Sequence, residues 1–408
     1  MLEGKILADY ADLVIKIGVN LQKGQGLEIV CPVEKSFFAT ALTQSAYKAG
    51  AKIVRVRWES QTIDKLNYAN AKTEDLVKVP KWLISNRNSL VEENFCYVAI
   101  SADDPSAFKD ISPEKIGLIA RARAKALKKY FNAVMSNTIR WCVISVPTYE
   151  WAKQVFPSSS NPEEQLSLAI ENCMRLHCDN PLESWKKHIE ILDKRAEFLN
   201  NQRFEFLHFT NSKGTDLLVG LADNHKWLSA KERAKDGVYF VANMPTEEIF
   251  TAPHRLKVDG VVKSALPLCE NGQIIDDFSI KFKKGKIVDF SAKQGYDTLK
   301  QLIQTDKGTS YLGEVALIGK NSPIAKSNIL FYNTLFDENA SCHLAIGKAY
   351  PTTIIDGENL SLKQLKQLGA NQSSEHFDFM IGTLDLKVEG IKKNGEKITL
   401  LDDGDWVI

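Results

Sequence analysis

Two histidines in the last fifth of this 408-residue sequence each lie close to a carboxylate. Glu338 comes shortly before His343, and His376 is separated from Asp378 by one residue. Imidazole nitrogens and carboxylate oxygens are the ligands that zinc and harder divalent ions take from proteins. On a strand, His376 and Asp378 would point to the same face, and Phe377 to the other. The alternative is a half-buried strand that carries a surface ion pair.

The spacing between Glu338 and His343 does not suit one helical face, because five residues turn a helix by about 140° beyond a full circle. A turn or a helix-end loop must therefore bring the two side chains together. The segment after Glu338 reads as a helix start, with Asn339 or Ser341 as the cap. The alternative is that Asp337 and Glu338 only complement the positive end of that helix.

A further carboxylate, Glu314, lies in the middle of an apolar run from Tyr311 to Ile318. Such a run is typical of a buried strand. An unpaired carboxylate is costly in that environment, so it is neutralised, joined to a cation in an ion pair, or bound to a metal ion. The residues alone leave the ion pair open beside metal binding and catalysis.

Glu248 lies in a segment, residues 243–253, that follows a predicted strand and contains Pro245 and Pro253. The two prolines predict a fixed loop, and loops at strand ends often carry functional residues. The alternative is a helical turn capped by Thr246, with Glu247 and Glu248 as its acidic first positions.

The composition argues against several classes of protein. Lys and Arg number 52 against 51 for Asp and Glu, so the net charge of +1 offers no broad footprint for nucleic acid or a membrane surface. We find no signal-peptide pattern and no run of about 18 apolar residues. The seven cysteines form no C-x-x-C pair, which indicates reduced thiols in a cytoplasmic protein.

The length predicts at least two domains. In residues 1–180, strand-like runs alternate with helical ones, which predicts an open α/β domain with a parallel sheet. From residue 203 the sequence changes to short β runs separated by Gly and Asn, which predicts an α+β, β-rich catalytic domain over residues 181–408. The predicted N-terminal strands are 27–31, 51–58, 95–101 and 138–146, and the helices between them include 35–49, 73–90 and 113–130. The second strand alternates apolar and basic residues.

Four motifs follow one another in the second half of the chain. They are Asn-Met-Pro-Thr-Glu-Glu-Ile-Phe-Thr-Ala-Pro, Leu-Gly-Glu-Val-Ala-Leu, Asp-Glu-Asn-Ala-Ser-Cys-His-Leu-Ala-Ile-Gly-Lys-Ala-Tyr and His-Phe-Asp-Phe-Met-Ile-Gly. Together they closely resemble the motifs of the aminopeptidase T / aminopeptidase S family of bacterial dinuclear metalloaminopeptidases. The opening of the chain, Tyr-Ala-Asp-Leu-Val-Ile-Lys-Ile-Gly, also resembles the start of that family, so the resemblance spans the whole chain.

The resemblance implies two divalent metal ions, zinc or cobalt, with manganese or magnesium as alternatives, held in the C-terminal domain. It also implies a homodimer that acts on peptides with a free N-terminus. In this family's chemistry a water activated by both ions attacks the N-terminal peptide bond. The implied ligands are Glu248, Glu314, Glu338, His343, His376 and Asp378, with Glu314 bridging the ions.

Tyr350, seven residues after His343, is a candidate catalytic residue that would stabilise the tetrahedral oxyanion. The alternative is a tyrosine before Pro351 that only packs.

Two other functions compete with an aminopeptidase. A different two-metal hydrolase, such as a deacylase or phosphoesterase, could use the same ligands on N-blocked amides or phosphate esters. A binding protein with a purely structural acidic cluster would bind metal without turnover. The complete set of ligand types argues against the binding protein, whereas only the resemblance argues against the second hydrolase.

Overall fold

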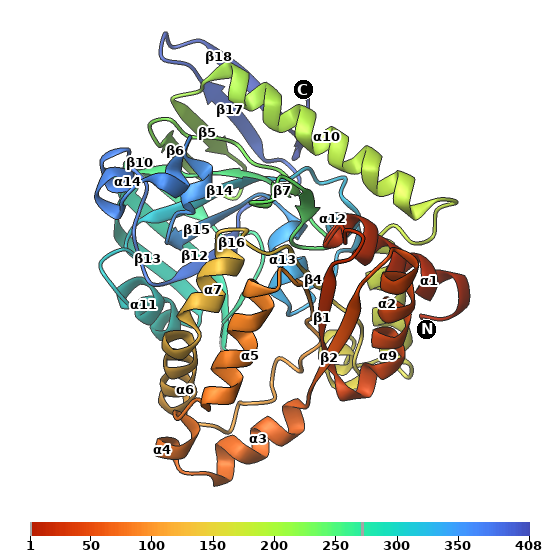
Figure 1. Cartoon of the computed structure of the whole chain (residues 1–408). Helices are drawn as coiled ribbons and strands as arrows, with labels where there is room; N and C mark the ends of the chain where they lie inside the picture. The colour runs from red at the N-terminus through yellow and green to blue at the C-terminus, as the bar shows by residue number, and fades with distance from the viewer. Residues whose placement is uncertain (1, 271–272) are drawn as a thin grey trace. The chain divides into compact units, whose positions relative to one another are not determined.

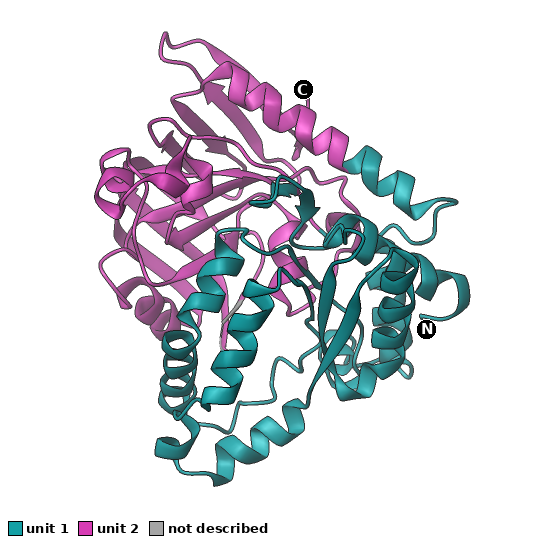
Figure 2. Cartoon of the chain, viewed as in Figure 1, with its two compact units in different colours: residues 1–188, 231–245 teal, residues 189–230, 246–408 magenta. Residues whose placement is uncertain are grey.

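The computed structural model describes residues 2–270 and 273–408 (Figure 1). The chain forms two compact units, which Figure 2 shows in different colours. Unit 1 comprises residues 1–188 and 231–245, and unit 2 comprises residues 189–230 and 246–408. The segment 231–245, which the sequence-based division assigned to the C-terminal domain, thus belongs to unit 1. Whether residues 1–180 and 181–408 act as independent domains stays a prediction.

Unit 1 is built on a parallel sheet with the strand order β2-β1-β3-β4. Helices α1, α2 and α9 lie on one face of this sheet and α5, α6 and α7 on the other (Figure 1). The strands are β1 (Gly26–Pro32), β2 (Ile53–Glu59), β3 (Cys96–Ile100) and β4 (Trp141–Ile144), with a separate hairpin of β7 (Lys231–Arg233) and β8 (Tyr239–Val241). The helices are α1 (Gly4–Leu13), α2 (Ser36–Lys48), α3 (Gln61–Asn70), α4 (Thr73–Leu76), α5 (Lys81–Glu92), α6 (Pro113–Ala126), α7 (Lys128–Met135), α8 (Tyr149–Val155), α9 (Pro162–Cys173) and the first part of α10 (Pro181–Gln202).

Two predicted helices of unit 1 are interrupted. The helix expected over residues 73–90 is divided into α4 and α5, because Pro80 has no N–H to donate and lies at the start of α5. The helix expected over residues 113–130 is divided into α6 and α7 at Leu127. The order of strands and helices nevertheless confirms the predicted open α/β fold.

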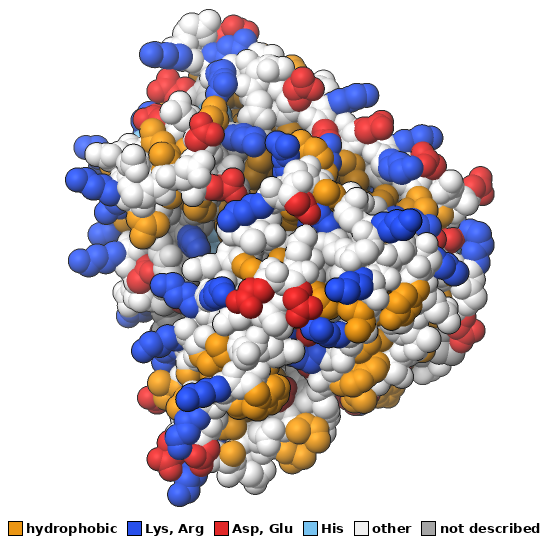
Figure 3. Space-filling model, in the orientation of Figure 1, with side chains coloured by type: hydrophobic (Ala, Val, Ile, Leu, Met, Phe, Trp, Pro, Cys, Tyr) orange, Lys and Arg blue, Asp and Glu red, His pale blue; other side chains and the backbone are white. Residues whose placement is uncertain are grey.

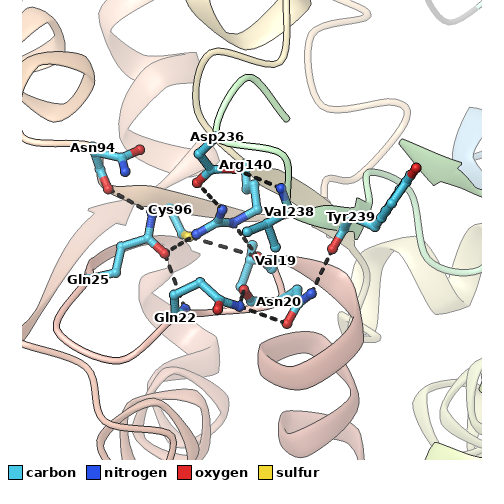
Figure 4. Close-up of polar contacts among 10 residues, drawn as sticks. All are labelled: Val19, Asn20, Gln22, Gln25, Asn94, Cys96, Arg140, Asp236, Val238 and Tyr239. Carbon is cyan, nitrogen blue, oxygen red and sulfur yellow. Dashed lines mark hydrogen bonds and ion pairs between the residues drawn. The ribbon is translucent and has the colours of Figure 1, made fainter. Parts of the chain in front are cut away.

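A buried arginine links the segment 231–245 to the parallel sheet of unit 1 (Figure 4). Arg140 is only 1% exposed, and its Nε donates to the carbonyl of Val19 at 3.1 Å. Its two terminal nitrogens donate to the carboxylate of Asp236 and to the side-chain oxygen of Gln25. Asn20 adds a hydrogen bond to the carbonyl of Tyr239 at 2.7 Å. Each nitrogen of the buried guanidinium therefore has an acceptor.

Unit 2 contains two antiparallel sheets. In the larger sheet the strand order is β11-β12-β10-β6-β5-β17-β18-β19, and β13 pairs with β12. Its strands are β5 (Phe206–Thr210), β6 (Asp216–Leu221), β10 (Pro253–Lys263), β11 (Leu268–Glu270), β12 (Gln273–Lys283), β13 (Lys286–Gln294), β17 (Lys387–Ile391), β18 (Lys397–Asp402) and β19 (Asp405–Trp406). The smaller sheet, β16-β15-β14-β9, consists of β9 (Ile249–Thr251), β14 (Leu312–Leu317), β15 (His343–Gly347) and β16 (His376–Met380). The helices are α11 (Tyr296–Gln304), α12 (Pro323–Ser327), α13 (Thr334–Asp337) and α14 (Leu362–Gln367), with the rest of α10. This unit confirms the predicted β-rich α+β class.

The six cysteine side chains that the structure describes are not in disulfide bonds, and of these only that of Cys178 is exposed. The side chain of Cys269 lies outside the described residues. Within residues 2–270 and 273–408, every helix is too short or too polar to cross a membrane.

Candidate metal centre

The smaller sheet of unit 2 brings the predicted ligands onto one face. Glu314 of β14 pairs with Ala345 of β15, which pairs in turn with Asp378 of β16. His343 lies two residues before Ala345, and His376 lies two residues before Asp378. Because alternate residues of a strand point to the same face, all four polar side chains project from one side of the sheet.

Small residues keep the middle of this face open. Ala345 lies between Glu314 and Asp378 in the pairing register, and Gly347 pairs with His376. Gly347 has a φ of 108°, and a Cβ at this position would lie 2.2 Å from the carbonyl oxygen of Glu375. A larger side chain at position 345 would fill the space between the two carboxylates, so the register leaves room there for a ligand.

The ligand atoms lie within a few ångströms of one another. His343 Nε2 is 3.3 Å from Glu248 Oε2, 3.5 Å from Glu314 Oε1 and 3.9 Å from Asp378 Oδ1. His376 Nε2 is 3.2 Å from Asp378 Oδ1. Two groups of potential ligand atoms, each within 4.8 Å, can be drawn from these residues, and both contain Glu314. The first group adds Glu248 and His343, and the second adds His376 and Asp378.

Glu248 comes directly before β9, which pairs with β14 through Ile249 and Leu317. The alternative helical turn at Thr246 does not form, and the backbone there is irregular. Pairing of β9 with β14 therefore brings Glu248 to the strand that carries Glu314, as expected for a loop at a strand end.

Glu338 lies in a short 3₁₀ turn, Glu338–Ala340, that follows α13. It is outside the two groups, but it lines a cavity together with His376 and Asp378. Burial first, and then the charges of Glu248 and Asp378, raise the pKa of Glu338 well above its usual range. The sixth predicted ligand thus lies within electrostatic reach of the other carboxylates.

The helix expected after Glu338 does not form, because β15 begins at His343. Asn339, one of the two candidate caps, is fully buried and has a different role. Its side-chain oxygen accepts the N–H of Glu247 at 2.8 Å, and its amide nitrogen donates to the carbonyl of Leu335 at 3.2 Å. The predicted turn between Glu338 and His343 is confirmed, whereas the predicted helix start is wrong.

Electrostatic shifts show that this site holds too much negative charge for its own histidines. Burial raises the pKa of Glu314 despite its hydrogen bond with His343. For His343 itself, burial lowers the pKa, but contacts with Glu248 and Glu314 outweigh burial and raise it well above the usual range. Burial lowers the pKa of His376, but the charge and hydrogen bond of Asp378, together with the charge of Glu314 and the Lys348 carbonyl, outweigh burial and raise the pKa to about 10. Burial raises the pKa of Asp378, but the charge and hydrogen bond of His376 outweigh burial and lower the pKa below its usual value. Protons held at such positions are what a bound cation would replace.

Two buried polar atoms test whether the residues fit metal ions. His343 Nδ1 is buried and has no hydrogen-bond partner in the described chain, and Asp378 Oδ1 is buried beside two histidine nitrogens without a hydrogen bond of favourable geometry. His376 Nδ1 lies 2.7 Å from the carbonyl of Lys348, which fixes the ring and leaves Nε2 directed toward Asp378. A site with more carboxylates than histidines, and with an imidazole oriented by a backbone carbonyl, is suited to divalent ions. The contact from Lys348 could not be predicted from the sequence, because no local pattern signals a carbonyl contact between segments this far apart.

Tyr350 lies beside His376, with their ring centroids 4.9 Å apart. Burial, followed by the charges of Glu314 and Asp378, raises the pKa of its hydroxyl far above the usual range. The hydroxyl therefore stays protonated and can act as a hydrogen-bond donor at the site. A cavity of about 110 Å³ adjoins the site, and Tyr332 and Met380 contribute to its wall.

Comparisons with known proteins agree with the motifs. The sequence profile of the thermophilic metalloprotease family M29 matches residues 4–406. Aminopeptidase 2 of Geobacillus stearothermophilus is 40% identical over 404 residues, which are 98% of each chain. Aminopeptidase AmpS of Bacillus subtilis is also 40% identical, over 403 residues and 98% of each chain.

A solved structure, wild-type AmpT from Thermus thermophilus, aligns with this chain with a TM-score of 0.93 at 35% sequence identity. The alignment covers 99% of both chains, so the two-part fold is shared throughout. These findings confirm the family resemblance drawn from the four motifs. The chain belongs to the M29 family of metalloproteases.

Proposed function

We propose that this chain is an aminopeptidase that binds two divalent metal ions and removes N-terminal residues from peptides. The proposed ligands are Glu248, Glu314, Glu338, His343, His376 and Asp378. One observation carries the proposal: two groups of ligand atoms on one face of a sheet have Glu314 in common. A carboxylate has two oxygens, so a shared glutamate suits a bridge between neighbouring ions. The named aminopeptidases among the relatives support the reaction.

Bound divalent ions would supply an acidified water as the nucleophile and would polarise the scissile carbonyl. In this proposal the chain itself provides three further contributions. The carboxylate of Glu314, which is buried at the centre of the site, would hold the ions, together with the other ligands. The Tyr350 hydroxyl, held protonated, donates a hydrogen bond to the developing oxyanion. His376 is kept in one orientation by the Lys348 carbonyl.

The proposed ions also bear on the substrate class. A free α-amine has a nitrogen lone pair that could bind a divalent ion, whereas the amide nitrogen of an N-acetylated peptide does not offer one. We therefore propose peptides with a free N-terminus as substrates. Zinc or cobalt are the proposed ions, with manganese or magnesium as alternatives. A homodimeric state and a cytoplasmic location stay predictions from the sequence.

The test is hydrolysis of a panel of aminoacyl-p-nitroanilides by metal-stripped protein, with zinc, cobalt, manganese or magnesium added back. We expect metal-restored cleavage of free-amine substrates and none of their N-acetylated counterparts. The variant His376→Ala should stay inactive with every metal. His208→Ala is the matched control, because His208 also pairs with an aspartate, Asp216, at 2.7 Å in unit 2 but outside the site.

Cleavage of only the N-acetylated substrates would show that the proposed aminopeptidase activity is wrong and that the protein is a deacylase with the same ligands. Metal-dependent thermal stabilisation without turnover on any substrate would point instead to a structural metal site. Equal activity of His376→Ala and His208→Ala would remove the proposed site altogether.

A further inference from the structure

A cleft of about 770 Å³ lies in unit 1, remote in sequence from the candidate metal ligands. It lies on the face of the parallel sheet that α5, α6 and α7 cover (Figure 1). Residues from β2, β3, α3, α5, α6 and α7 line it. The proposed aminopeptidase reaction uses none of these residues.

The sheet face beneath this cleft carries charges that a covered parallel strand does not normally have. Arg55 of β2 pairs with Glu28 of β1, which pairs with Tyr97 of β3, so the three form one row. Arg57 follows Arg55 by two residues and therefore points to the same face. The alternation of basic and apolar residues in this strand, visible in the sequence, thus places polar side chains on the sheet face that the helices cover.

Three donors in this cleft lack an acceptor. Arg87 is 3% exposed and Tyr130 is 5% exposed, and both line the cleft. Within the described chain, Arg87 Nη2, Tyr130 Oη and Arg57 Nε are buried and have no hydrogen-bond partner. The guanidinium carbon of Arg87 lies over the Tyr130 ring, 5.7 Å from its centre, so the two side chains are neighbours in the cleft. Buried donors without acceptors are unusual in native proteins and call for an explanation.

The charges in the cleft limit what such an acceptor can be. Arg87 and Arg57 each have one nitrogen in an ion pair, with Glu28 and Glu59 respectively. Glu59 and Asp64 also line the cleft, together with a third cation, Arg123. Two carboxylates nearby disfavour a doubly charged ligand such as phosphate. A singly charged carboxylate would instead satisfy the free donors of the guanidinium groups.

The walls of the cleft are apolar. Trp58 is 48% exposed, Phe131 is 43% exposed and Ile63 is 56% exposed, although all are large hydrophobic residues. Figure 3 shows hydrophobic side chains gathered on the surface where α3, α5 and β2 lie in Figure 1. Exposed aromatic and branched side chains around polar ones are typical of a site for an amphipathic small molecule.

We propose that this cleft binds a monocarboxylate with an aromatic or branched apolar body. The carboxylate accepts hydrogen bonds from Arg87, Tyr130 and Arg57, and the apolar body packs against Ile63 and Phe131. This site is built from unit 1 alone and does not depend on the proposed metal centre.

The experiment is isothermal titration calorimetry of the full-length protein with phenylacetate. 2-Phenylethanol tests the same ring without the charge, acetate tests the charge without the ring, and inorganic phosphate tests a different anion. We expect phenylacetate to bind more tightly than each of the other three. Tyr130→Phe removes one donor and keeps the ring, and it should weaken phenylacetate binding by at least about tenfold, as expected for a hydrogen bond to a charged group.

Tyr47→Phe is the matched control, because Tyr47 is exposed on α2, which covers the opposite face of the sheet. Thermal melting by circular dichroism checks that both variants are folded. Binding of 2-phenylethanol as tight as that of phenylacetate would overturn the proposal, and so would wild-type affinity in folded Tyr130→Phe. If phenylacetate does not bind and Trp58→Glu converts a dimer to a monomer in sedimentation, the cleft is an interface between copies and the proposal is wrong.

Discussion

Arg140 in unit 1 and Glu314 in unit 2 are both buried charges, at 1% and 5% exposure, but their surroundings differ. Each nitrogen of Arg140 has an acceptor from the chain, in Val19, Gln25 and Asp236. Around Glu314, carboxylates accumulate, and among the ion pairs of the described residues Glu248, Glu314 and Asp378 pair with histidines alone. A buried charge is tolerated when it is paired and hydrogen-bonded. The first cluster is satisfied by partners from the chain, whereas the second gathers carboxylates beside histidines alone, as expected if it binds cations under the proposed function.

The largest expected effect is on turnover when the shared carboxylate is neutralised. Glu314→Gln keeps the shape of the side chain but removes its charge and its capacity to bridge ions. We expect kcat/KM to fall by at least about a thousandfold, or about 4 kcal/mol of activation free energy. Steady-state kinetics with saturating cobalt measure the loss. Glu396→Gln, in the exposed pair with Lys392, is the control and should keep wild-type kinetics.

Arg140→Met tests the first cluster. It leaves Gln25 and Asp236 without their donor, and breaking a buried pair typically costs about 3–5 kcal/mol. We expect a loss near the lower end, about 3 kcal/mol in the free energy of unfolding, because the Asp236 side chain is 37% exposed. Urea unfolding measures it, with Arg121→Met on the exposed side of α6 as the control. The loss should be the same with and without metal, and a metal-dependent loss would contradict the contrast between the clusters.

Tyr350→Phe separates packing from catalysis, because the ring that contacts His376 remains. Removal of one donor to an oxyanion typically lowers kcat by about a hundredfold or more. We expect that loss with an unchanged melting temperature. An unchanged kcat would leave Tyr350 with a packing role only.

Glu338→Gln should have opposite effects on stability and activity. Because burial and neighbouring charges raise the pKa of Glu338, its ionised form destabilises the metal-free fold. In metal-free protein at pH 8, we expect the variant to gain about 1 kcal/mol in the free energy of unfolding, because a neutral amide avoids the cost of burying an unpaired carboxylate. The wild-type protein should lose this stability as the pH rises above the usual carboxyl range, and the variant should not. Added metal should stabilise the wild type more than the variant, while turnover of the variant falls. Equal pH profiles for the two proteins would argue against this account.

Asp306 is a carboxylate whose oxygens accept several hydrogen bonds from the chain. Its substitution should have the smallest of the expected effects. It accepts N–H groups from Gly308, Thr309 and Ser374 and hydroxyls from Ser373 and Ser374, and its pKa falls to about 2 although burial opposes this. The stability it contributes is present above about pH 4 and is lost as the pH falls toward 2. After discounting for solvent screening, we expect Asp306→Asn to cost below about 1 kcal/mol at pH 7. Urea unfolding at pH 7 and pH 3 should show a smaller difference from wild type at pH 3.

Much of the candidate site could be predicted because it depends on local pattern. The alternation at His376 and Asp378 indicated a shared face, and the apolar run around Glu314 indicated a buried strand. Metal binding by these residues stays a prediction, because the positions of side chains alone do not identify a bound ion. The register that sets Ala345 between two carboxylates could not be predicted, because strand pairing joins residues far apart in the sequence.

The same limit explains the errors. Asn339 has the residue type of a helix cap, but its side chain bonds to Glu247, almost a hundred residues away in the chain. The short β runs of residues 231–245 resemble those of unit 2, yet the guanidinium of Arg140 attaches them to unit 1. In both cases a distant polar partner outweighed a local preference.

The return of residues 231–245 to unit 1 also has a consequence during synthesis. The chain passes between the units after residues 188, 230 and 245, so neither unit is a continuous stretch of the gene. As the nascent chain leaves the ribosome N-terminus first, Arg140 emerges nearly a hundred residues before Asp236. Unit 1 can therefore complete its core only after part of unit 2 has already been translated, and a gene fragment cut at residue 188 would encode a buried arginine without its carboxylate.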